Sequence, residues 1–339
     1  MADNKCLIAV DAMGGDFAPH NVVLGAIEAI KKNRNIEVLL VGQKDKIKEE
    51  LAKIKDYKFP EENIVDAPEV ITMEDKPADA VKNKQNSSIV IGLKLVKERK
   101  ACAFVSAGNT GAVMAASTLI LGRVKGCTRP TIGTFMPSES GVTTIFDVGA
   151  NVDCKPINLL EFAIMGTVFV REIYDIDNPS VGLLSVGEED KKGNDVSKTA
   201  FAMLKSAKIN FFGNVEGRDI TKGTVNVVVC DGFVGNIVLK FGEGIYALFK
   251  SMIKKAAKTN PLLIPALLLV RFFIRKEYKK FDYQTYGGVP LLGVNGISII
   301  GHGSSSILAI KNMILRANEM KQKAITEKIE KGLLEYTNN

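Results

Sequence analysis

Two short loops of small and polar residues have the composition of anion-binding sites. They are Ser106 to Gly111 (Ser-Ala-Gly-Asn-Thr-Gly) and Gly301 to Ser306 (Gly-His-Gly-Ser-Ser-Ser), and each lies between an apolar run and a helical pattern. In that position free backbone N–H groups and the positive end of a helix can face a phosphate or a developing oxyanion. We therefore expect both loops to bind an anion, with Asn109, His302 and Ser304 as the contributing side chains.

A third loop carries two acids around a glycine pair. It joins the apolar run of residues 6–10 to a helical pattern that starts near Pro19. Gly14 and Gly15 allow a positive φ, and Asp11 and Asp16 are placed to orient a polar ligand. Aspartates also stabilise tight turns through local hydrogen bonds, so a purely structural role explains the same residues. The sequence is compatible with both roles, orientation of a ligand and stabilisation of the turn.

Similar loops follow most of the other predicted strands. Small residues with amide or carboxylate side chains occupy residues 147–151, 185–189, 213–217 and 231–236. Because the carboxyl ends of parallel strands meet at one edge of a sheet, this pattern predicts a ligand site there. Asp231, Gly232 and Asn236 are candidates for it.

The elements that must position these loops alternate along the chain, which predicts an α/β fold with a doubly wound, mostly parallel sheet. Residues 1–335 are expected to form one large unit of one or two lobes, because no low-complexity linker interrupts them. The expected strands are residues 6–10, 36–41, 101–105, 131–135, 143–148, 180–184, 209–212, 225–230 and 297–300. The expected helices are residues 45–55, 87–97, 110–121, 158–174, 195–205 and 305–315.

The net charge of +7 comes from one segment. Residues 250–280 contain nine basic residues and one acid, Glu277, whereas the rest of the chain has 36 basic and 37 acidic residues. A dense apolar block, residues 261–274, lies between the cations, unlike the interleaved aromatics of a nucleic-acid surface. We expect no nucleic acid as a partner, and an anionic membrane or an acidic protein instead.

Several cofactor and nucleophile motifs are missing from the sequence. It contains no G-x-x-x-x-G-K-[ST] loop, no dinucleotide fingerprint, no H-E-x-x-H and no G-x-S-x-G elbow. We therefore expect neither a metal nor another cofactor. The five cysteines show no C-x-x-C spacing, which predicts reduced, mostly buried thiols. No secretory signal is visible at the amino terminus.

Only two histidines are available for catalysis. His302 suits either loop ordering or direct contact with reacting groups, and the sequence does not decide between them. For His20, at the start of a predicted helix, a structural or capping role is favoured.

Collinear motifs along the chain resemble the PlsX family, the bacterial phosphate acyltransferases. The resemblance runs from about residue 7 to residue 330. The motifs that carry it are residues 10–16 (VDAMGGD), 106–112 (SAGNTGA), 129–130 (RP), 147–151 (DVGAN), 182–189 (GLLSVGEE), 214–217 (NVEG), 230–236 (CDGFVGN) and 287–293 (GGVPLLG).

The resemblance implies transfer of a long-chain acyl group from acyl carrier protein to inorganic phosphate, which gives an acyl phosphate for phospholipid synthesis. It also implies a homodimer and a fold like that of the isocitrate and isopropylmalate dehydrogenases and phosphotransacetylase. Phosphate is already an anionic nucleophile, so the protein has only to align it and stabilise the oxyanion. The candidate catalytic residues are Asn109, Asp231, Asn236, His302 and Ser304. The candidate substrate-binding residues are Asp11, Gly14, Gly15, Asp16, Ser106, Gly108, Thr110, Gly111, Gly232, Gly301, Gly303 and Ser305.

Two other functions fit parts of the sequence. An NAD-dependent β-decarboxylating dehydrogenase shares the implied fold but needs a cluster of metal-binding aspartates. A noncatalytic scaffold could use the basic segment to recruit lipid enzymes to a membrane.

Residues 250–280 are expected to form a helical hairpin on the inner face of the cytoplasmic membrane. Thr259-Asn260-Pro261 forms the turn, Pro265 lies in the first turn of the second helix, and Arg271, Arg275 and Lys279 recur at helical spacing. Leu267, Val270, Ile274 and Tyr278 form the opposite side. The apolar block is shorter than the roughly 20 residues that cross a bilayer, so the protein is expected to be cytoplasmic and peripherally attached. Packing against a dimer partner, or binding of the acidic carrier protein, explains the same segment.

Overall fold

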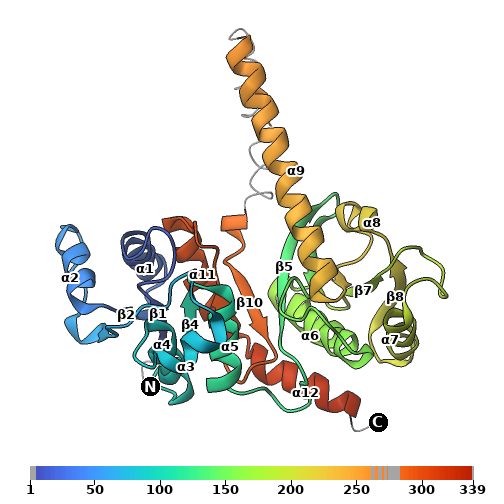
Figure 1. Ribbon diagram of the computed structural model, residues 1–339, viewed down its shortest axis with the longest axis horizontal. Helices are drawn as coiled ribbons and strands as arrows, with labels where there is room; N and C mark the ends of the chain where they lie inside the picture. The colour runs from blue at the N-terminus through green and yellow to red at the C-terminus, as the bar shows by residue number, and fades with distance from the viewer. Residues whose placement is uncertain (1–4, 261–263, 266–268, 271–272, 274–282, 338–339) are drawn as a thin grey trace. The chain divides into compact units, whose positions relative to one another are not determined.

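The computed structural model describes residues 5–260, 264–265, 269–270, 273 and 283–337. The chain divides into two compact units (Figure 1). Unit 1 consists of Met1–Gly133, Ile164–Asn178 and Tyr283–Asn339, and unit 2 of Thr134–Ala163 and Pro179–Asp282. The chain therefore passes from one unit to the other several times, through strand β5 (Thr131–Ser138) and helix α6 (Pro156–Tyr174) among other segments.

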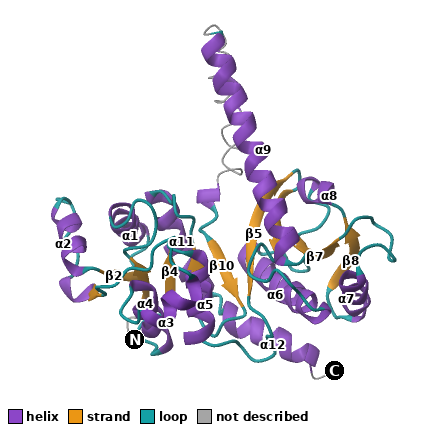
Figure 2. Cartoon of the chain, viewed as in Figure 1, coloured by secondary structure: helices purple, strands orange, loops and turns teal. Residues whose placement is uncertain are grey.

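The sheet of unit 1 is mostly parallel (Figure 2). Its strand order is β3 (Ile64–Asp66), β2 (Ile36–Gly42), β1 (Cys6–Asp11), β4 (Ala103–Ser106), β11 (Ser298–Ile300), β10 (Val289–Leu292) and the start of β5. The first five are parallel, and β10 is antiparallel to both neighbours. Continuous apolar runs form the central strands, as expected for strands covered on both faces.

Helices cover this sheet on both sides (Figure 1). One group is α1 (His20–Lys32) with α11 (Ile307–Gln322), and the other contains α3 (Pro77–Asn83), α4 (Ser88–Lys97) and α5 (Thr110–Ile120). Gly25 lets α1 approach α11 closely, because a Cβ there would lie 2.6 Å from the Cβ of Ile310. Helices α2 (Lys44–Ala52) and α12 (Ile325–Thr337) and the short 3-10 turns η1 (Glu61–Asn63) and η2 (Tyr283–Thr285) complete the unit. Its core includes Ile8, Leu40, Leu93 and Phe104.

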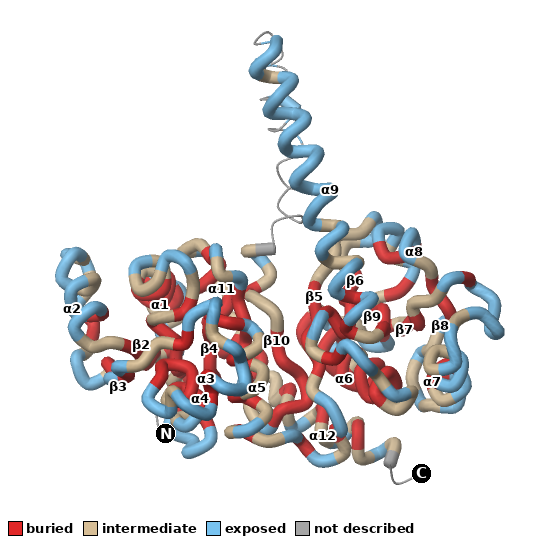
Figure 3. The backbone as a smooth tube through the Cα atoms, viewed as in Figure 1, coloured by how far each residue is buried: buried red, intermediate tan, exposed pale blue. Residues whose placement is uncertain are grey.

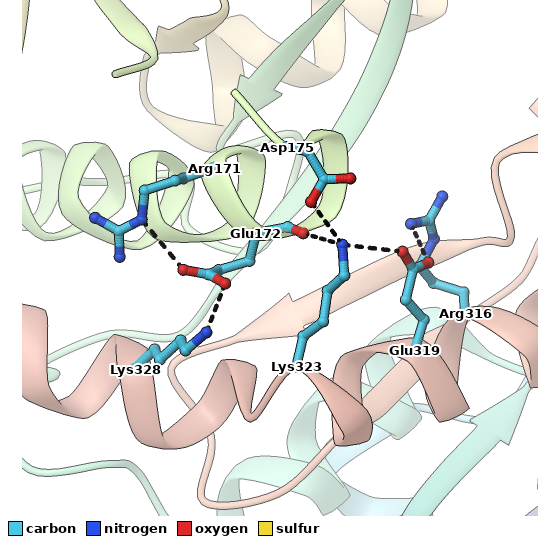
Figure 4. Close-up of polar contacts among 7 residues, drawn as sticks. All are labelled: Arg171, Glu172, Asp175, Arg316, Glu319, Lys323 and Lys328. Carbon is cyan, nitrogen blue, oxygen red and sulfur yellow. Dashed lines mark hydrogen bonds and ion pairs between the residues drawn. The ribbon is translucent and has the colours of Figure 1, made fainter. Parts of the chain in front are cut away.

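A charged network joins three helices of unit 1 (Figure 4). Glu172, near the end of α6, accepts hydrogen bonds from Arg171 and from Lys328 on α12. Lys323, which follows α11, bonds to the Asp175 carboxylate and forms an ion pair with Glu319. These contacts hold the end of α6 against the carboxyl-terminal helices. Ionic contacts to Lys328 and Arg171 outweigh burial and lower the pKa of Glu172.

Four strands of unit 2 pair in parallel. Strands β6 (Gly141–Phe146), β9 (Val227–Val229), β7 (Ser180–Leu184) and β8 (Asn210–Val215) lie in that order and pair in parallel. Helices α7 (Asp195–Ser206), α8 (Gly217–Lys222) and α9 (Gly232–Thr259) belong to the same unit. Ile145, Phe146, Leu160 and Phe162 form the centre of its core.

Helix α9 extends away from the sheet of its unit, and almost all of it is exposed (Figure 3). Only Gly232 and Gly235 of this helix are buried. Large apolar side chains nevertheless recur at steps of three or four residues, and therefore lie on one side of the helix. These exposed side chains are Val234, Ile237, Phe241, Ile245, Leu248 and Met252. An apolar side of this length is typical of a helix that meets a further surface.

Most of the predicted strands and helices are confirmed. The prediction missed β3, which has three residues, and β10, which contains Pro290 and is antiparallel. It also missed α3, α8 and α12, and placed the start of α9 far too late. Four glycines in the first half of α9, at residues 232, 235, 242 and 244, lower its helix propensity, which explains why the sequence placed its start too late.

The prediction of reduced cysteines is wrong for one pair. Cys6 and Cys102 form a disulfide with an S–S distance of 2.07 Å, whereas Cys127, Cys154 and Cys230 are free thiols. Strand β1 pairs in parallel with β4, so Cys6 at the start of β1 lies beside Cys102 just before β4, with a Cα–Cα distance of 5.9 Å. Because the two cysteines are 96 residues apart in sequence, their spacing does not indicate that they are neighbours in the fold.

The predicted hairpin over residues 250–280 is only partly described. Helix α9 ends at Thr259, as the predicted turn requires, but it starts at Gly232. Ile264, Leu269, Val270 and Phe273 are helical and exposed. The predicted positions Leu267, Arg271, Ile274, Arg275, Tyr278 and Lys279 lie outside the described residues. Among the described helices, none combines the length and apolar character needed to cross a bilayer.

Candidate active site

Three loops that the sequence singled out meet at one edge of the unit 1 sheet. Strands β1, β4 and β11 are neighbours and parallel, so the loops that follow them leave the sheet side by side. The backbone N–H of Asp16 donates to the carbonyl of Gly303 at 2.8 Å, which joins the first loop to the third. Gly14 approaches Gly108 closely, which joins the first loop to the second. The predicted meeting of strand ends is therefore observed for these three loops.

A buried hydrogen-bonded pair forms the base of this edge. The Ser106 hydroxyl donates to Oδ2 of Asp11 at 2.7 Å and accepts the N–H of Gly108 at 3.0 Å. The other oxygen of Asp11 accepts the N–H of Met13 at 3.1 Å. Burial raises the pKa of the Asp11 carboxyl, although bonds from Ser88, Ser106, Met13 and Gly14 partly oppose that shift. One carboxylate thus sets the shape of two loops.

Gly14 and Gly15 are required by close packing and by backbone conformation. A Cβ at Gly14 would lie 2.5 Å from Oδ2 of Asp11 and 2.7 Å from the backbone nitrogen of Gly108. Gly15 has φ +103°, a region that side chains strongly disfavour, and its Cβ position lies 3.0 Å from the Gly303 carbonyl oxygen. Any side chain at either position would push the three loops apart.

His302 and Ser304 form a small exposed hydrogen-bonded arrangement. Nδ1 of His302 accepts the N–H of Ser304 at 3.2 Å and lies 2.8 Å from the Ser304 hydroxyl. Because a backbone N–H can only donate, Nδ1 is the acceptor nitrogen and a neutral ring carries its proton on Nε2. The Ser304 hydroxyl then donates to the same nitrogen.

The rest of this loop is held by buried Ser305. Its hydroxyl and its N–H both donate to the carbonyl of His302, at 2.6 and 2.9 Å. Its own carbonyl accepts from the amide of Asn21 on α1 at 3.1 Å. The loop that begins at Gly301 is thus fixed from two sides before α11 starts, with Ser306 as the helix N-cap.

The side chain of Asn109 holds the start of α5. It is the N-cap of α5, and its Oδ1 accepts the N–H of Ala112 at 3.0 Å. Its Nδ2 donates to the carbonyls of Thr72 and Asp75, at 3.0 and 3.2 Å. The side chain therefore anchors a neighbouring loop to the start of α5. Thr110 and Gly111 form the first turn of that helix, and a Cβ at Gly111 would meet Pro77 at 2.7 Å.

His20 lies at the beginning of α1 and is exposed. Its Nδ1 is 3.0 Å from Oε2 of Glu50 on α2, and this contact together with Lys53 lowers the pKa of Glu50. The N-cap of α1 is Pro19, which provides no side-chain cap. The role of His20 in the structure is thus a contact between two helices.

Asp231, Gly232 and Asn236 form a second group, in unit 2. Asp231 is the N-cap of α9, and its carboxylate accepts the N–H of Val234 at 2.8 Å. The N–H of Gly232 donates to the carbonyl of Asn151 at 2.7 Å. Asn236 is exposed and lies beside Gly149.

The assignment of site residues from the sequence missed a buried acid beneath this second group. Asp147, directly after β6, accepts the N–H groups of Gly149 and Ala150 at 3.1 and 3.0 Å and the amide of Asn151 at 2.7 Å. The motif of residues 147–151 was visible, but its acid resembles any turn aspartate until the burial is known. Asp147 is fully buried, so it orders the loop that in turn holds Gly232.

Comparison with known proteins identifies the family. A model of the family described as "Fatty acid synthesis protein" matches residues 6–328. The chain belongs to this family. Two relatives carry the name phosphate acyltransferase. The one from Chlorobaculum parvum is 52% identical, over 95% of this chain and 97% of the relative. The one from Halothermothrix orenii is 48% identical, over 96% of this chain and 98% of the relative. The resemblance to the phosphate acyltransferases is confirmed, and with it the prediction of an enzyme.

Solved structures of other enzymes share the fold. A phosphotransacetylase from Streptococcus pyogenes matches with a TM-score of 0.62 and 19% identity over 94% of each chain. A 4-hydroxythreonine-4-phosphate dehydrogenase from Salmonella typhimurium matches with a TM-score of 0.53 and 11% identity, over 93% of this chain and 99% of the other. The predicted α/β fold is thereby confirmed.

Among the residues that the structure describes, no three His, Cys, Asp or Glu side chains lie close enough together to hold a metal ion.

Proposed function

We propose that this enzyme transfers a long-chain fatty acyl group from acyl carrier protein to inorganic phosphate and releases an acyl phosphate for phospholipid synthesis. The observation that carries the proposal is the meeting of three glycine-containing loops at the edge of the unit 1 sheet, beside the amino-terminal ends of α5 and α11. Backbone N–H groups and helix ends in such a place suit a tetrahedral oxyanion. The names of the relatives support phosphate as the acceptor.

The reaction needs no covalent enzyme intermediate. A phosphate oxygen attacks the thioester carbonyl carbon, the new C–O bond forms, and the C–S bond of the tetrahedral intermediate then breaks. The carrier leaves as a thiolate, which takes up a proton. The protein contributes alignment of the two substrates and stabilisation of the carbonyl oxygen as it gains negative charge.

We assign direct contacts with phosphate or the oxyanion to His302 and Ser304, which are exposed at the site. A proton on Nε2 of His302 would serve as a donor to either group. Asp11 and Ser106 act as positioning residues, because both are buried and bonded to each other. Asn109 is also a positioning residue in this proposal, since its amide holds the loop at Thr72 and Asp75. Gly14, Gly15 and Gly303 allow the loops of the site to approach one another closely.

In unit 2 we assign Asp231, Gly232 and Asn236 to orientation of the acyl donor. Asp231 caps α9 and Gly232 is tied to Asn151, so the start of this helix is held firmly. Asn236 is exposed one turn later and can reach a substrate.

Partner binding is assigned to α9 and the residues that follow it. We propose that the exposed apolar side of α9, defined by Ile237, Phe241, Leu248 and Met252, packs against a second copy of the chain to form a homodimer. Phe241→Glu combined with Leu248→Glu should then convert dimer to monomer in light scattering. A wild-type chain that is monomeric at micromolar concentration would contradict this assignment.

The basic end of α9 and the apolar residues that follow it are assigned to reversible attachment to the inner face of the cytoplasmic membrane. Lys250, Lys254 and Lys258 recur every four residues, and each cation near an anionic surface contributes about 1 kcal/mol. Leu269 and Phe273 are exposed apolar side chains in the same region. Leu269→Glu should reduce sedimentation with anionic liposomes, and binding of the wild type should weaken with salt. Loss of the dimer without loss of liposome binding would favour the partner-packing alternative.

The central experiment measures phosphate-dependent release of free carrier protein from palmitoyl acyl carrier protein. We expect release that depends on phosphate, acyl phosphate as the product, and no change on addition of EDTA. An absolute requirement for NAD, or inactivation by EDTA, would contradict the proposal. Binding of carrier protein without any product would support the scaffold alternative instead.

A further inference from the structure

Unit 2 contains a pocket beside the carboxyl end of β7. Its volume is about 190 Å³. Residues that follow β7, the first turn of α7 and the start of α9 contribute to its lining. The aliphatic part of the lining is Leu159, Leu183, Leu184, Val186, Val196 and Val234. Val186 is 82% exposed, so an apolar side chain reaches the surface at this pocket.

The other residues of the lining are Ser185, Gly193, Asn194, Ser197, Cys230 and Asp231. The hydroxyl of Ser185 is buried and has no hydrogen-bond partner among the described residues. Its backbone N–H is satisfied by the carbonyl of Val215 at 2.8 Å, so only the side chain lacks a partner. The hydroxyl of Ser197 donates to the carbonyl of Asn194 at 2.9 Å and retains its acceptor capacity. Buried hydroxyls are normally paired, so Ser185 indicates a partner group that the described part of the chain does not supply.

Gly193 keeps the space near these hydroxyls open. It has φ +106°, and a Cβ there would lie 2.1 Å from the Ser197 hydroxyl oxygen and 3.2 Å from that of Ser185. Neither the backbone conformation nor the space therefore admits a side chain.

The loop that forms one wall of the pocket is held in place by its own unit. The amide of Asn214 on β8 donates to the carbonyl of Glu189 at 2.9 Å. Glu188 pairs with Arg218 at 3.1 Å and Asp190 pairs with Lys205 at 3.1 Å. The pocket is therefore formed before any ligand arrives.

We propose that this pocket binds a segment of the pantetheine arm on which the acyl donor is carried. The inference rests on the proposed function and extends it to the way the donor is held. A pantetheine arm alternates aliphatic segments with amides, and the pocket likewise combines aliphatic walls with hydroxyl groups. The Ser185 hydroxyl would donate to an amide carbonyl of the arm. The pocket is smaller than the roughly 300 Å³ at which sites for whole ligands begin, so it accommodates only a segment.

A fatty tail is the competing occupant, and the polar lining argues against it. A hydrocarbon chain has no group that could pair with Ser185, so its binding would leave a hydroxyl buried and unsatisfied. An amide carbonyl of the pantetheine arm would accept a hydrogen bond from the Ser185 hydroxyl and so remove that penalty.

Binding without turnover tests the inference. Isothermal titration would compare S-hexadecyl pantetheine, an unreactive thioether, with hexadecanoate, which has the tail but no arm. We expect Ser185→Ala to weaken binding of the thioether about tenfold and to leave hexadecanoate unchanged. Val196→Phe, which fills the pocket, should weaken the thioether at least as much. Ser206→Ala, at the exposed far end of α7, is the matched control and should change neither.

The melting temperature separates a binding role from a structural one. Because the Ser185 hydroxyl has no partner among the described residues, Ser185→Ala should leave the melting temperature unchanged or raise it. Equal weakening of both probes, or weakening of neither, would overturn the inference. These results are independent of catalysis. If the Ser185→Ala and Val196→Phe variants form acyl phosphate with wild-type kinetics, the pocket assignment alone is overturned. If the proteins bind the probes as expected but the wild type forms no acyl phosphate, the proposed function alone is overturned.

Discussion

Each of the two units ends a strand in a buried aspartate, and the two acids are used differently. In unit 1, Asp11 at the end of β1 accepts a hydroxyl from the neighbouring strand's loop, at Ser106. In unit 2, Asp147, just after β6, accepts three donors from its own loop, the last of them from Asn151. The first acid therefore couples two loops, whereas the second stabilises one.

The surroundings of the two acids also differ. The loops around Asp11 contain close-packed glycines, and the loop after β11, which is bonded to Asp16, carries the exposed polar pair His302 and Ser304. Unit 2 instead contains the partly apolar pocket with Ser185. Both units thus have a strand that leads into a loop held by a buried aspartate. In unit 1 the neighbouring surface is polar, whereas unit 2 contains a pocket with both apolar and polar lining. In the proposed reaction, the thioester donor and the anionic acceptor require surfaces of these two kinds.

The largest effect is expected for Gly14→Ala. The new Cβ would collide with the Asp11 carboxylate and the Gly108 nitrogen, so all three loops of the unit 1 site would move. We expect kcat/KM for acyl phosphate formation to fall about 10³-fold, since displaced oxyanion donors are costly. Gly244→Ala, where a Cβ meets open space in exposed α9, is the matched control and should leave the rate unchanged. Equal kinetics for both variants would remove the loops of unit 1 from catalysis.

Removing either exposed polar side chain should have a smaller effect. We expect His302→Ala and Ser304→Ala each to lower kcat/KM about 10²-fold, a loss of about 2.7 kcal/mol of transition-state stabilisation. Because the two side chains are bonded to each other at 2.8 Å, the double variant should lose little more than either single one. Steady-state kinetics of the three variants, with melting curves as the folding control, test this. Fully additive losses would show that the two side chains act separately, and near-normal rates would exclude both from the site.

Asp147→Asn distinguishes the acid of unit 2 from the acid of unit 1. An amide presents only one acceptor oxygen, so at least one of the buried donors around residue 147 loses its partner. We expect the free energy of unfolding to fall by about 2 kcal/mol, with kcat/KM per folded molecule close to that of the wild type. Urea denaturation and kinetics at low temperature measure the two quantities. A large catalytic loss at full stability would mean that the two acids have the same role.

The effect of Asp11→Asn on the free energy of unfolding should depend on pH. Burial raises the pKa of Asp11, so the folded state binds a proton more readily than the unfolded state does. The stability that this group contributes is fully present below its unfolded pKa, near 4, and is lost as the pH rises through the folded pKa. The stability advantage of the wild type over Asp11→Asn should therefore shrink between pH 4 and pH 7. Denaturation at three pH values measures it, with Asp56→Asn on the surface as the control. An advantage that grows with pH would contradict the raised pKa.

The sequence was sufficient to predict the parallel strands and the loops that meet in unit 1. Uninterrupted apolar runs identified β1, β2 and β7, and the rule that parallel strands share an edge brought Asp11, Ser106 and Gly303 together. Short or interrupted strands were missed, because three residues in β3 and a proline in β10 carry too little pattern.

Features that depend on distant partners could not be predicted in this way. The side chain of Asn109 was assigned to catalysis because its residue type suits an oxyanion, yet it bonds to carbonyls at residues 72 and 75, where the sequence shows no pattern. Burial of Asp147 and the unpaired hydroxyl of Ser185 are properties of packing. The disulfide between Cys6 and Cys102 depends on strand order, which spacing does not reveal.

The position of β11 between β4 and β10 has a consequence for synthesis of the protein on the ribosome. Residue Ser298 pairs with Phe104, so β4 has no neighbour on that side until the last part of the chain has been made. All of the residues of unit 2 emerge before that point, and they can form their own parallel sheet while unit 1 is still incomplete. Contacts between residues so far apart in sequence also slow folding. A nascent chain that stalls before residue 298 would expose the edge of β4, and chaperone binding is expected to concentrate in this interval of translation.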